Sequence, residues 1–372
     1  MSEYGGGFSQ SSAYDLAQLL AQSISPVFAT DRVTTGTASA ARIELQGRLL
    51  TDSEHAYAVM SERFGAFGYM AVLRRQPSGV LVIGIPAVRP AVPGHDWRAL
   101  TLFVLTLLSV LYAGGLMQAS DWLWPIRHPL AGVPFAVGLL GVLVAHELGH
   151  YLMSRRLGVA ASPPYFIPMP IFSMFGTMGA IIRTREPMRS RSQLLAIGAA
   201  GPLSGLLVAV PLLVVGLLRS EVLPIVQESG VLMEGNFALY AFLKYLVFGR
   251  FLPSGGYDVF LDPVAFGAWA ALFVTGLNLT PAGQLDGGHV AYALLGRQSR
   301  WLSRLMVFAA VLLTVVWSGW WMFALLLIVL GQRYAEPLDD VTPLRAPEKV
   351  LAVGVLVLFL LLFAPVPMTI IP

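Results

Sequence analysis

The sequence predicts an α-helical polytopic membrane protein with six to seven transmembrane helices and a small N-terminal cytoplasmic α+β domain. Two observations support this fold class. Hydrophobic residues make up 56% of the 372 residues and charged residues only 12%, whereas soluble domains average about 25% charged residues. The apolar residues also gather in runs that approach the roughly 20 residues a helix needs to cross a bilayer, and these runs begin only after residue 96.

Residues 1–96 have the patterning of a soluble fold. Amphipathic spacing predicts helices, and alternation of polar and apolar side chains predicts strands. A stretch rich in proline and glycine at residues 89–94 predicts a linker. We therefore expect a small α+β domain with its linker over residues 1–96 and a transmembrane domain over residues 97–372. The expected helices cover residues 14–24 and 53–64, and the expected strands cover residues 41–50, 69–75 and 80–86.

The rest of the chain contains the apolar runs that predict its spans. The fourth run is long and is interrupted by glycine and proline, so we expect a broken helix there, which a membrane tolerates where protein covers the backbone. The fifth and sixth runs are short and favour a hairpin. In order, the runs cover residues 100–117, 133–153, 194–218, 264–295, 305–316, 320–330 and 350–363.

Arginine-rich segments predict the orientation, because positively charged loops stay on the cytoplasmic side. With the spans as drawn, the arginine groups fall on one side of the membrane. We therefore expect a multi-pass protein of the cell (cytoplasmic) membrane whose N-terminal domain is cytoplasmic. The arginines are Arg74, Arg75, Arg89 and Arg98 before the first span, Arg155, Arg156, Arg183, Arg185, Arg189 and Arg191 after the second, and Arg297, Arg300 and Arg304 after the fourth.

Composition excludes several other classes. There is no cysteine, so disulfides and thiolate metal ligands are excluded. The net charge of +3 reflects membrane orientation in such a chain, and we expect no nucleic-acid partner. Residues 1–10 lack the basic and apolar regions of a signal peptide and the arginine-rich pattern of a transit peptide, so a prokaryotic cytoplasmic membrane is the expected location.

The motif His146-Glu147-Leu148-Gly149-His150 lies inside the second apolar run. On a helix, side chains four residues apart share one face, so His146 and His150 can bind one Zn²⁺. Glu147 lies beside them, where it can take a proton from a water that the metal activates. Ionisable residues in membranes also serve ion pathways, so the motif alone leaves a transport role open.

A catalytic zinc takes three protein ligands and keeps one position open. Within the apolar runs the carboxylates are Glu147 and Asp286. Because Glu147 is the natural base, Asp286 is left as the third ligand, with His289 as the competing candidate. We favour Asp286 because it lies in residues 278–288, where Pro281 and three glycines allow unwound backbone.

These motifs resemble those of the site-2 protease family, which are intramembrane zinc metalloproteases. That family pairs HExxH on one core helix with NxxPxxxLDG on another, and here the two motifs occupy residues 146–150 and 278–287. A third family element, an AGPLxG-type segment of small residues, corresponds to residues 200–205. Residues 164–180 and 283–289 are similar to the branch that contains archaeal enzymes and plastid EGY-type proteins.

The resemblance implies a transmembrane metalloprotease domain with one Zn²⁺ per chain. His146, His150 and Asp286 would bind the ion, and Glu147 would be the general base. It further implies single-span transmembrane protein substrates, cut inside the lipid bilayer in regulated intramembrane proteolysis, and leaves the oligomeric state open. Asp262-Pro263 stands where that branch often has His-Pro. This difference puts the role of that loop in question, but it does not affect the expected metal site.

Two further side chains have alternative roles. Asn278 can hydrogen-bond the substrate backbone or the tetrahedral oxyanion, or it can link two helices. His289 follows Asp286 by three residues and can orient that carboxylate through a hydrogen bond, or it can be a satisfied histidine near the membrane interface.

Two segments between the spans have distinctive compositions. Residues 162–183 are apolar, but their prolines and glycines predict a membrane-dipping loop or a short hairpin. A helical peptide hides its amides and must unfold to be cut, so we expect one edge of this hairpin to pair with the substrate as an added strand. Residues 236–251 are amphipathic and aromatic, and we expect them to lie along the outer interface, with a substrate gate as the alternative.

Other function classes fit part of the sequence. A membrane metallopeptidase that acts on lipidated or soluble peptides also uses HExxH, but it typically takes a third ligand from a second Glu, and no second Glu lies in the apolar runs. A membrane metal transporter or a non-catalytic membrane scaffold is the alternative outside hydrolysis. One base beside three ligands fits hydrolysis better than transport, and the intact Glu147 argues against a scaffold.

Overall fold

The computed structural model describes residues 10–36, 42–87, 96–119, 121–225, 232–331 and 334–370. The expected linker at residues 89–94, residue Ala41 of an expected strand, and residues 1–9 lie outside the described residues. The chain divides into two compact units. Unit 1 comprises Met1–Ala91, Pro187–Gln193 and Glu336–Arg345, and unit 2 comprises Val92–Glu186, Leu194–Ala335 and Ala346–Pro372.

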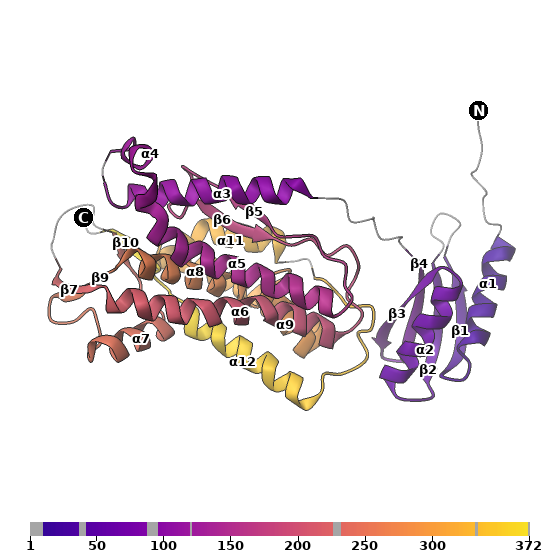
Figure 1. Ribbon diagram of the computed structural model, residues 1–372. Helices are drawn as coiled ribbons and strands as arrows, with labels where there is room; N and C mark the ends of the chain where they lie inside the picture. Colours follow the sequence, from indigo (N-terminus) through magenta and orange to yellow (C-terminus); the bar gives the residue numbers. More distant parts are fainter. Residues whose placement is uncertain are drawn as a thin grey trace. The chain divides into compact units, whose positions relative to one another are not determined.

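Unit 1 contains a four-stranded antiparallel sheet and two helices (Figure 1). The strands lie in the order β1-β2-β4-β3. In β2, Ile43 and Leu45 are buried and alternate with the partly exposed Glu44 and Gln46, as expected for a sheet with one covered face. The elements are α1 Gln10–Ser23, β1 Phe28–Thr35, β2 Ile43–Leu49, α2 Ser53–Ala66, β3 Tyr69–Gln76 and β4 Gly79–Pro86.

Strand β1 is the element of unit 1 that the sequence patterning does not predict. It lies at the edge of the sheet, and its register with β2 shifts between Thr30 and Arg32. Edge strands have fewer inward-facing positions to fill, and a bulge breaks the period of two. The strand therefore lacks a regular alternation of buried and exposed residues.

Unit 2 is built from helices, with two-stranded sheets between them (Figure 1). The expected hairpin at residues 162–183 is formed by β5 and β6, and the aromatic segment at 236–251 contains α7. The helices are α3 Trp97–Leu116, α4 Trp124–Arg127, η1 Pro129–Gly132, α5 Val133–Arg156, α6 Arg191–Leu218, α7 Ala238–Phe248, α8 Pro263–Asn278, α9 Asp286–Leu295, η2 Gly296–Gln298, α10 Ser299–Val316, α11 Trp320–Leu330 and α12 Ala346–Leu362; the strands are β5 Tyr165–Pro168, β6 Thr177–Ile181, β7 Glu221–Pro224, β8 Leu232–Glu234, β9 Tyr257–Phe260 and β10 Met368–Ile370.

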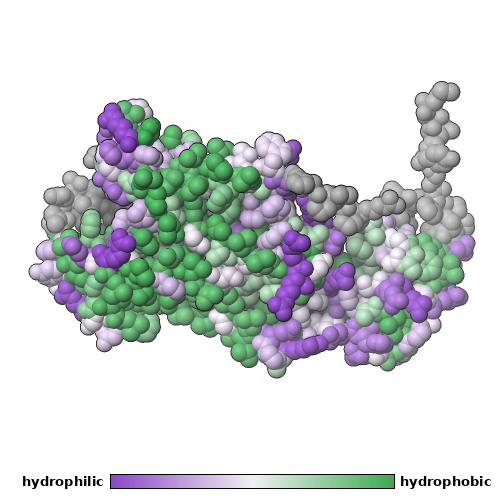
Figure 2. Space-filling model, in the orientation of Figure 1, coloured by the Kyte–Doolittle hydropathy of each residue, from purple (hydrophilic) through white to green (hydrophobic). Residues whose placement is uncertain are grey.

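Much of the helix surface is apolar and exposed. In the face shown in Figure 2, hydrophobic residues cover most of the helices of unit 2, and Leu207, Val315 and Val350 are 77%, 88% and 72% exposed. Such a surface requires lipid around it, so the chain is a membrane protein. Among the described residues, four helical segments are long and apolar enough to cross a membrane, and three shorter apolar helices accompany them. The total of six to seven spans remains a prediction. The four are Trp97–Leu116, Pro129–Arg156, Arg191–Leu218 and Asp286–Val316.

The long apolar run at residues 264–295 is two helices, α8 and α9, separated by a break at residues 279–285. Pro281 lacks an N–H group and cannot continue a helical ladder. Gly283 has a φ of +53°, which L side chains rarely adopt, and its N–H donates to Ser303 Oγ at 3.2 Å. The break therefore has a fixed path that begins a new helix at Asp286.

Helices α5 and α8 approach each other through glycine. A Cβ atom on Gly138 of α5 would lie 2.3 Å from the carbonyl oxygen of Val264, and one on Gly267 of α8 would lie 2.4 Å from that of Phe135. Small residues at such crossings let the two backbones pack tightly within a membrane. This packing places the helix with the HELGH motif beside the helix that leads to Asp286.

Candidate metal centre

The two histidines of the motif meet on one face of α5. His146 and His150 are one helical turn apart and are both buried, at 2% and 9% exposure. Their Nε2 atoms lie 3.2 Å apart. Two ring nitrogens at this distance can coordinate the same cation.

Asp286 completes the cluster from α9. Its Oδ2 lies 3.1 Å from His146 Nε2 and 3.3 Å from His150 Nε2. As the first residue of α9, it lies at a helix N-terminus, where a negative charge is favourable. Among the described residues, His146, His150 and Asp286 are the group of three side chains that can hold a metal ion.

The spacing of the three atoms fits zinc. Tetrahedral Zn²⁺ with bonds of about 2.0–2.1 Å requires its ligand atoms to lie about 3.3 Å apart, and the three separations here are 3.1, 3.2 and 3.3 Å. A neutral imidazole nitrogen also repels a carboxylate oxygen at such a distance unless a proton or a cation lies between them. The donor set of two imidazoles and one carboxylate is one that Zn²⁺ accepts.

A backbone carbonyl of α6 holds His150 in place. His150 Nδ1 donates to the carbonyl oxygen of Ile197 at 2.7 Å. Because a carbonyl can only accept, Nδ1 carries the ring proton and Nε2 keeps its lone pair directed at the cluster. Helix α6 therefore selects the tautomer of His150 that can bind a metal.

Two glycines of α6 leave room for the histidine rings. A Cβ on Gly201 would lie 2.0 Å from His150 Nε2, and a Cβ on Gly205 would lie 3.3 Å from His146 Cβ. These glycines belong to the small-residue segment at 200–205 that the sequence singled out, and Pro202 lies between them inside the continuous helix α6. The neighbour of Gly201 is His150 Nε2, the ring nitrogen that faces Asp286.

The remaining predicted site residues lie around this cluster. Glu147 is buried at 6% exposure between the two histidines along α5. Asn278 is the last residue of α8, and the described residues provide its side chain with no hydrogen-bond partner. His289 lies outside the three-residue cluster, and its Cβ is 3.0 Å from where a Cβ of Gly198 would stand.

Sequence reasoning missed the carbonyl of Ile197. A backbone group has no sequence signature of its own, and every residue carries one. Pro202 gave no signal for it, because the carbonyl that this interior proline leaves without its usual N–H partner belongs to Gly198 and not to Ile197.

An HExxH helix that meets a carboxylate from a broken helix, inside a bundle of apolar helices, defines the membrane-embedded metallopeptidase class. Comparison with known proteins agrees: residues 134–317 match the model of Peptidase family M50. The chain therefore contains a peptidase family M50 domain, the domain of site-2 proteases, and is similar to the EGY zinc metalloproteases of plants.

Three such relatives give the extent of the similarity. The chain is 30% identical to "Probable zinc metalloprotease EGY2, chloroplastic" of Arabidopsis thaliana over 87% of its own length and 59% of that protein's. It is 33% identical to the EGY2 protein of Oryza sativa subsp. indica over 55% and 36% of the two lengths. It is 30% identical to "Probable zinc metalloprotease EGY1, chloroplastic" of Arabidopsis thaliana over 63% and 43%. No solved structure matches the chain.

Proposed function

We propose that this protein is an intramembrane zinc endopeptidase that hydrolyses peptide bonds of single-span transmembrane substrates. The observation that carries the proposal is the triangle of His146 Nε2, His150 Nε2 and Asp286 Oδ2 with Glu147 beside it on α5. The M50 match over residues 134–317 supports the same chemistry. The chain spans about three fifths of the length of its Arabidopsis EGY2 relative, so the activity of the whole protein is part of the proposal.

Each residue of the centre has a distinct role in this chemistry. His146, His150 and Asp286 hold the ion, and zinc, when bound, supplies the Lewis acidity that activates a water and polarises the scissile carbonyl. Glu147 takes the proton from the attacking water and later returns it to the leaving amine. Asn278 hydrogen-bonds the substrate backbone or the oxyanion. His289 orients Asp286 from the same face of α9.

The β5–β6 hairpin is the proposed dock for the unfolded substrate. Gly176 of this hairpin accepts a hydrogen bond at 2.5 Å from Ser109 Oγ of α3, so the hairpin is fixed to a helix. Ile171 and Phe172 at its tip are 83% and 87% exposed. A fixed strand with an apolar tip can offer backbone hydrogen bonds to a peptide that has left its helix.

The arginine distribution supports a place for the protein in the cell membrane, with its N-terminal domain in the cytoplasm. The last turn of α5, just beyond His150, carries Arg155 and Arg156. In this orientation, cleavage occurs in the cytoplasmic half of the bilayer.

Product mapping tests the proposed function. Purified protein in lipid vesicles is incubated with a single-span substrate, and mass spectrometry locates the new termini. The expected products are cut inside or next to the transmembrane segment, and a zinc chelator abolishes them. Cuts confined to soluble flanking segments contradict an intramembrane protease, and metal uptake into vesicles without any cleavage would favour the transporter alternative.

A further inference from the structure

A segment distant in the sequence is bound to the edge strand β3 of unit 1. Leu73 of β3 pairs in parallel with Asp339. The Leu73 N–H donates to the Leu338 carbonyl at 2.8 Å, and the Asp340 N–H donates to the Leu73 carbonyl at 3.3 Å. Residues 338–340 therefore attach to β3 through an isolated bridge, although they lie more than 260 positions further along the chain.

A second segment is bridged to the first. Ser190 pairs in parallel with Asp339. The Leu338 N–H donates to the Met188 carbonyl, and the Asp339 N–H donates to the Arg189 carbonyl, both at 2.8 Å. Isolated parallel bridges thus hold two segments at the edge of the sheet of unit 1. We call these segments, residues 187–193 and 336–345, the captured segments.

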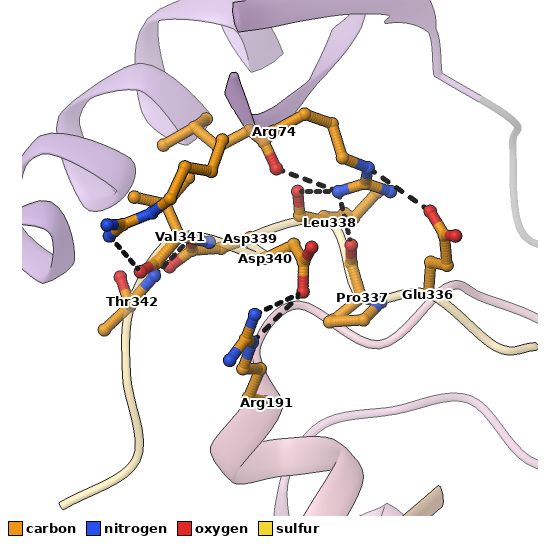
Figure 3. Close-up of polar contacts among 11 residues, drawn as sticks. Arg74, Arg191, Glu336, Pro337, Leu338, Asp339, Asp340, Val341 and Thr342 are labelled. Atoms are coloured by element: carbon orange, nitrogen blue, oxygen red, sulfur yellow. Dashed lines mark hydrogen bonds and ion pairs between the residues drawn. The ribbon is translucent and has the colours of Figure 1, made fainter. Parts of the chain in front are cut away.

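Charged side chains fasten the captured segments (Figure 3). Arg74 of β3 donates to the carbonyls of Pro337 and Leu338 at 2.8 and 3.1 Å and pairs with Glu336 at 3.4 Å. Arg191 pairs with Asp340 through two nitrogens, each at 3.0 Å. Asp340 is 4% exposed, so this second pair is largely shielded from the screening that weakens surface ion pairs.

The 336–345 segment is also part of the hydrophobic core of unit 1. Val341 is 5% exposed and belongs to the cluster that contains Leu45, Phe64 and Leu73. Asp339 Oδ1 accepts hydrogen bonds from the N–H groups of Val341 and Thr342 at 2.9 and 3.1 Å. These bonds turn the chain so that Val341 enters the core.

Each captured segment leads directly into a membrane helix. Arg191 is the first residue of α6, and α12 begins at Ala346, immediately after the second segment. Helix α6 also carries Ile197, which holds His150, six residues after Arg191. Six helical residues span only about 9 Å, so a displacement of the first turn of α6 reaches the carbonyl that orients a metal ligand.

We infer that the sheet of unit 1 is a control element for catalysis: by holding the 187–193 segment through Asp340, it sets the position of α6 and so the rate of peptide cleavage. The inference rests on the proposed protease function. In this inference, residues 1–91 regulate cleavage, and their effect is transmitted through the backbone of α6.

Charge reversal tests this inference on the full-length protein in lipid. Arg191→Asp and Asp340→Arg each bring like charges together, and the double variant restores an opposite pair. Hydrogen exchange reports release of residues 187–193 and 336–345, zinc is quantified per chain, and cleavage is measured with the same single-span substrate. Arg345→Gln, which removes an exposed ion pair with Glu54 in the same unit, is the matched control.

We expect faster exchange in both captured segments of each single variant, with cleavage reduced about fivefold or more and zinc unchanged. The double variant regains both protection and cleavage, and the Arg345→Gln control behaves as wild type. Released segments with a wild-type cleavage rate overturn the inference, as does a double variant that restores neither property. A wild-type protein that binds zinc but cleaves nothing counts against the proposed function instead.

Discussion

His150 donates its Nδ1 proton to the backbone carbonyl of Ile197 at 2.7 Å. This bond makes α6 the third helix of the candidate metal centre, after α5 with its two histidines and α9 with Asp286. The same helix clears space for the ring through Gly201. The centre therefore depends on a helix that contributes none of the expected ligands.

Gly201→Ala should disrupt the metal centre without adding any charge or polar group. The new Cβ would stand 2.0 Å from His150 Nε2, so the ring must leave its position. We expect zinc affinity, measured by competition with a chelator, to fall by about tenfold or more. Gly354→Ala on α12, where a Cβ meets nothing within 4 Å, is the control. Wild-type affinity in Gly201→Ala would show that His150 is not the ligand described here.

Asp286→Ala and His289→Ala separate the two candidates for the third ligand. Asp286 Oδ2 lies within 3.3 Å of both histidine nitrogens, whereas His289 lies outside the cluster. We expect the zinc content per chain to fall sharply in Asp286→Ala and to stay near one in His289→Ala, as measured by elemental analysis. The opposite pattern would assign the third ligand to His289.

Met178→Pro should impair cleavage while leaving the metal in place. Met178 lies in β6 and its side chain is half exposed, so the substitution removes a backbone N–H and distorts the strand more than it alters the core. We expect the cleavage rate to fall at least about tenfold with zinc unchanged, and Met178→Ala to remain active. Loss of zinc together with activity would show that the hairpin is structural rather than a substrate dock.

The captured 336–345 segment should be detectable through Tyr57. Burial, followed by the negative charge of Asp339, raises the pKa of Tyr57 from 10.0 to about 12. Because the folded-state pKa is the higher one, this group stabilises the fold fully below pH 10 and loses its contribution as the pH rises towards 12. The tyrosinate absorbance that Tyr57→Phe removes should titrate near pH 12, and earlier in an Asp339→Asn background. A component that titrates near pH 10 in the wild-type protein would place Tyr57 outside this environment.

The meeting of His146, His150 and Asp286 could be predicted from the sequence because it follows from local rules. Histidines four apart share a helix face, and an unpaired carboxylate within an apolar run needs a partner. Pro281 and Gly283 also predicted the break in the helix that precedes α9. By contrast, the Ile197 carbonyl and the capture of residues 336–345 depend on contacts between distant segments, which no local period encodes. Strand β1 escaped prediction because an edge strand with a bulge lacks regular alternation.

The most direct measurement is peptide cleavage by wild type and by Glu147→Gln, at equal zinc content, with one single-span substrate in lipid. Glu147 directly follows His146 in α5 and is buried, but it is not a member of the cluster of three candidate ligands. The proposed role of Glu147 predicts that the variant keeps one zinc per chain and loses about 100-fold or more of the cleavage rate, as expected when a general base is removed. Equal cleavage by the two proteins would contradict it.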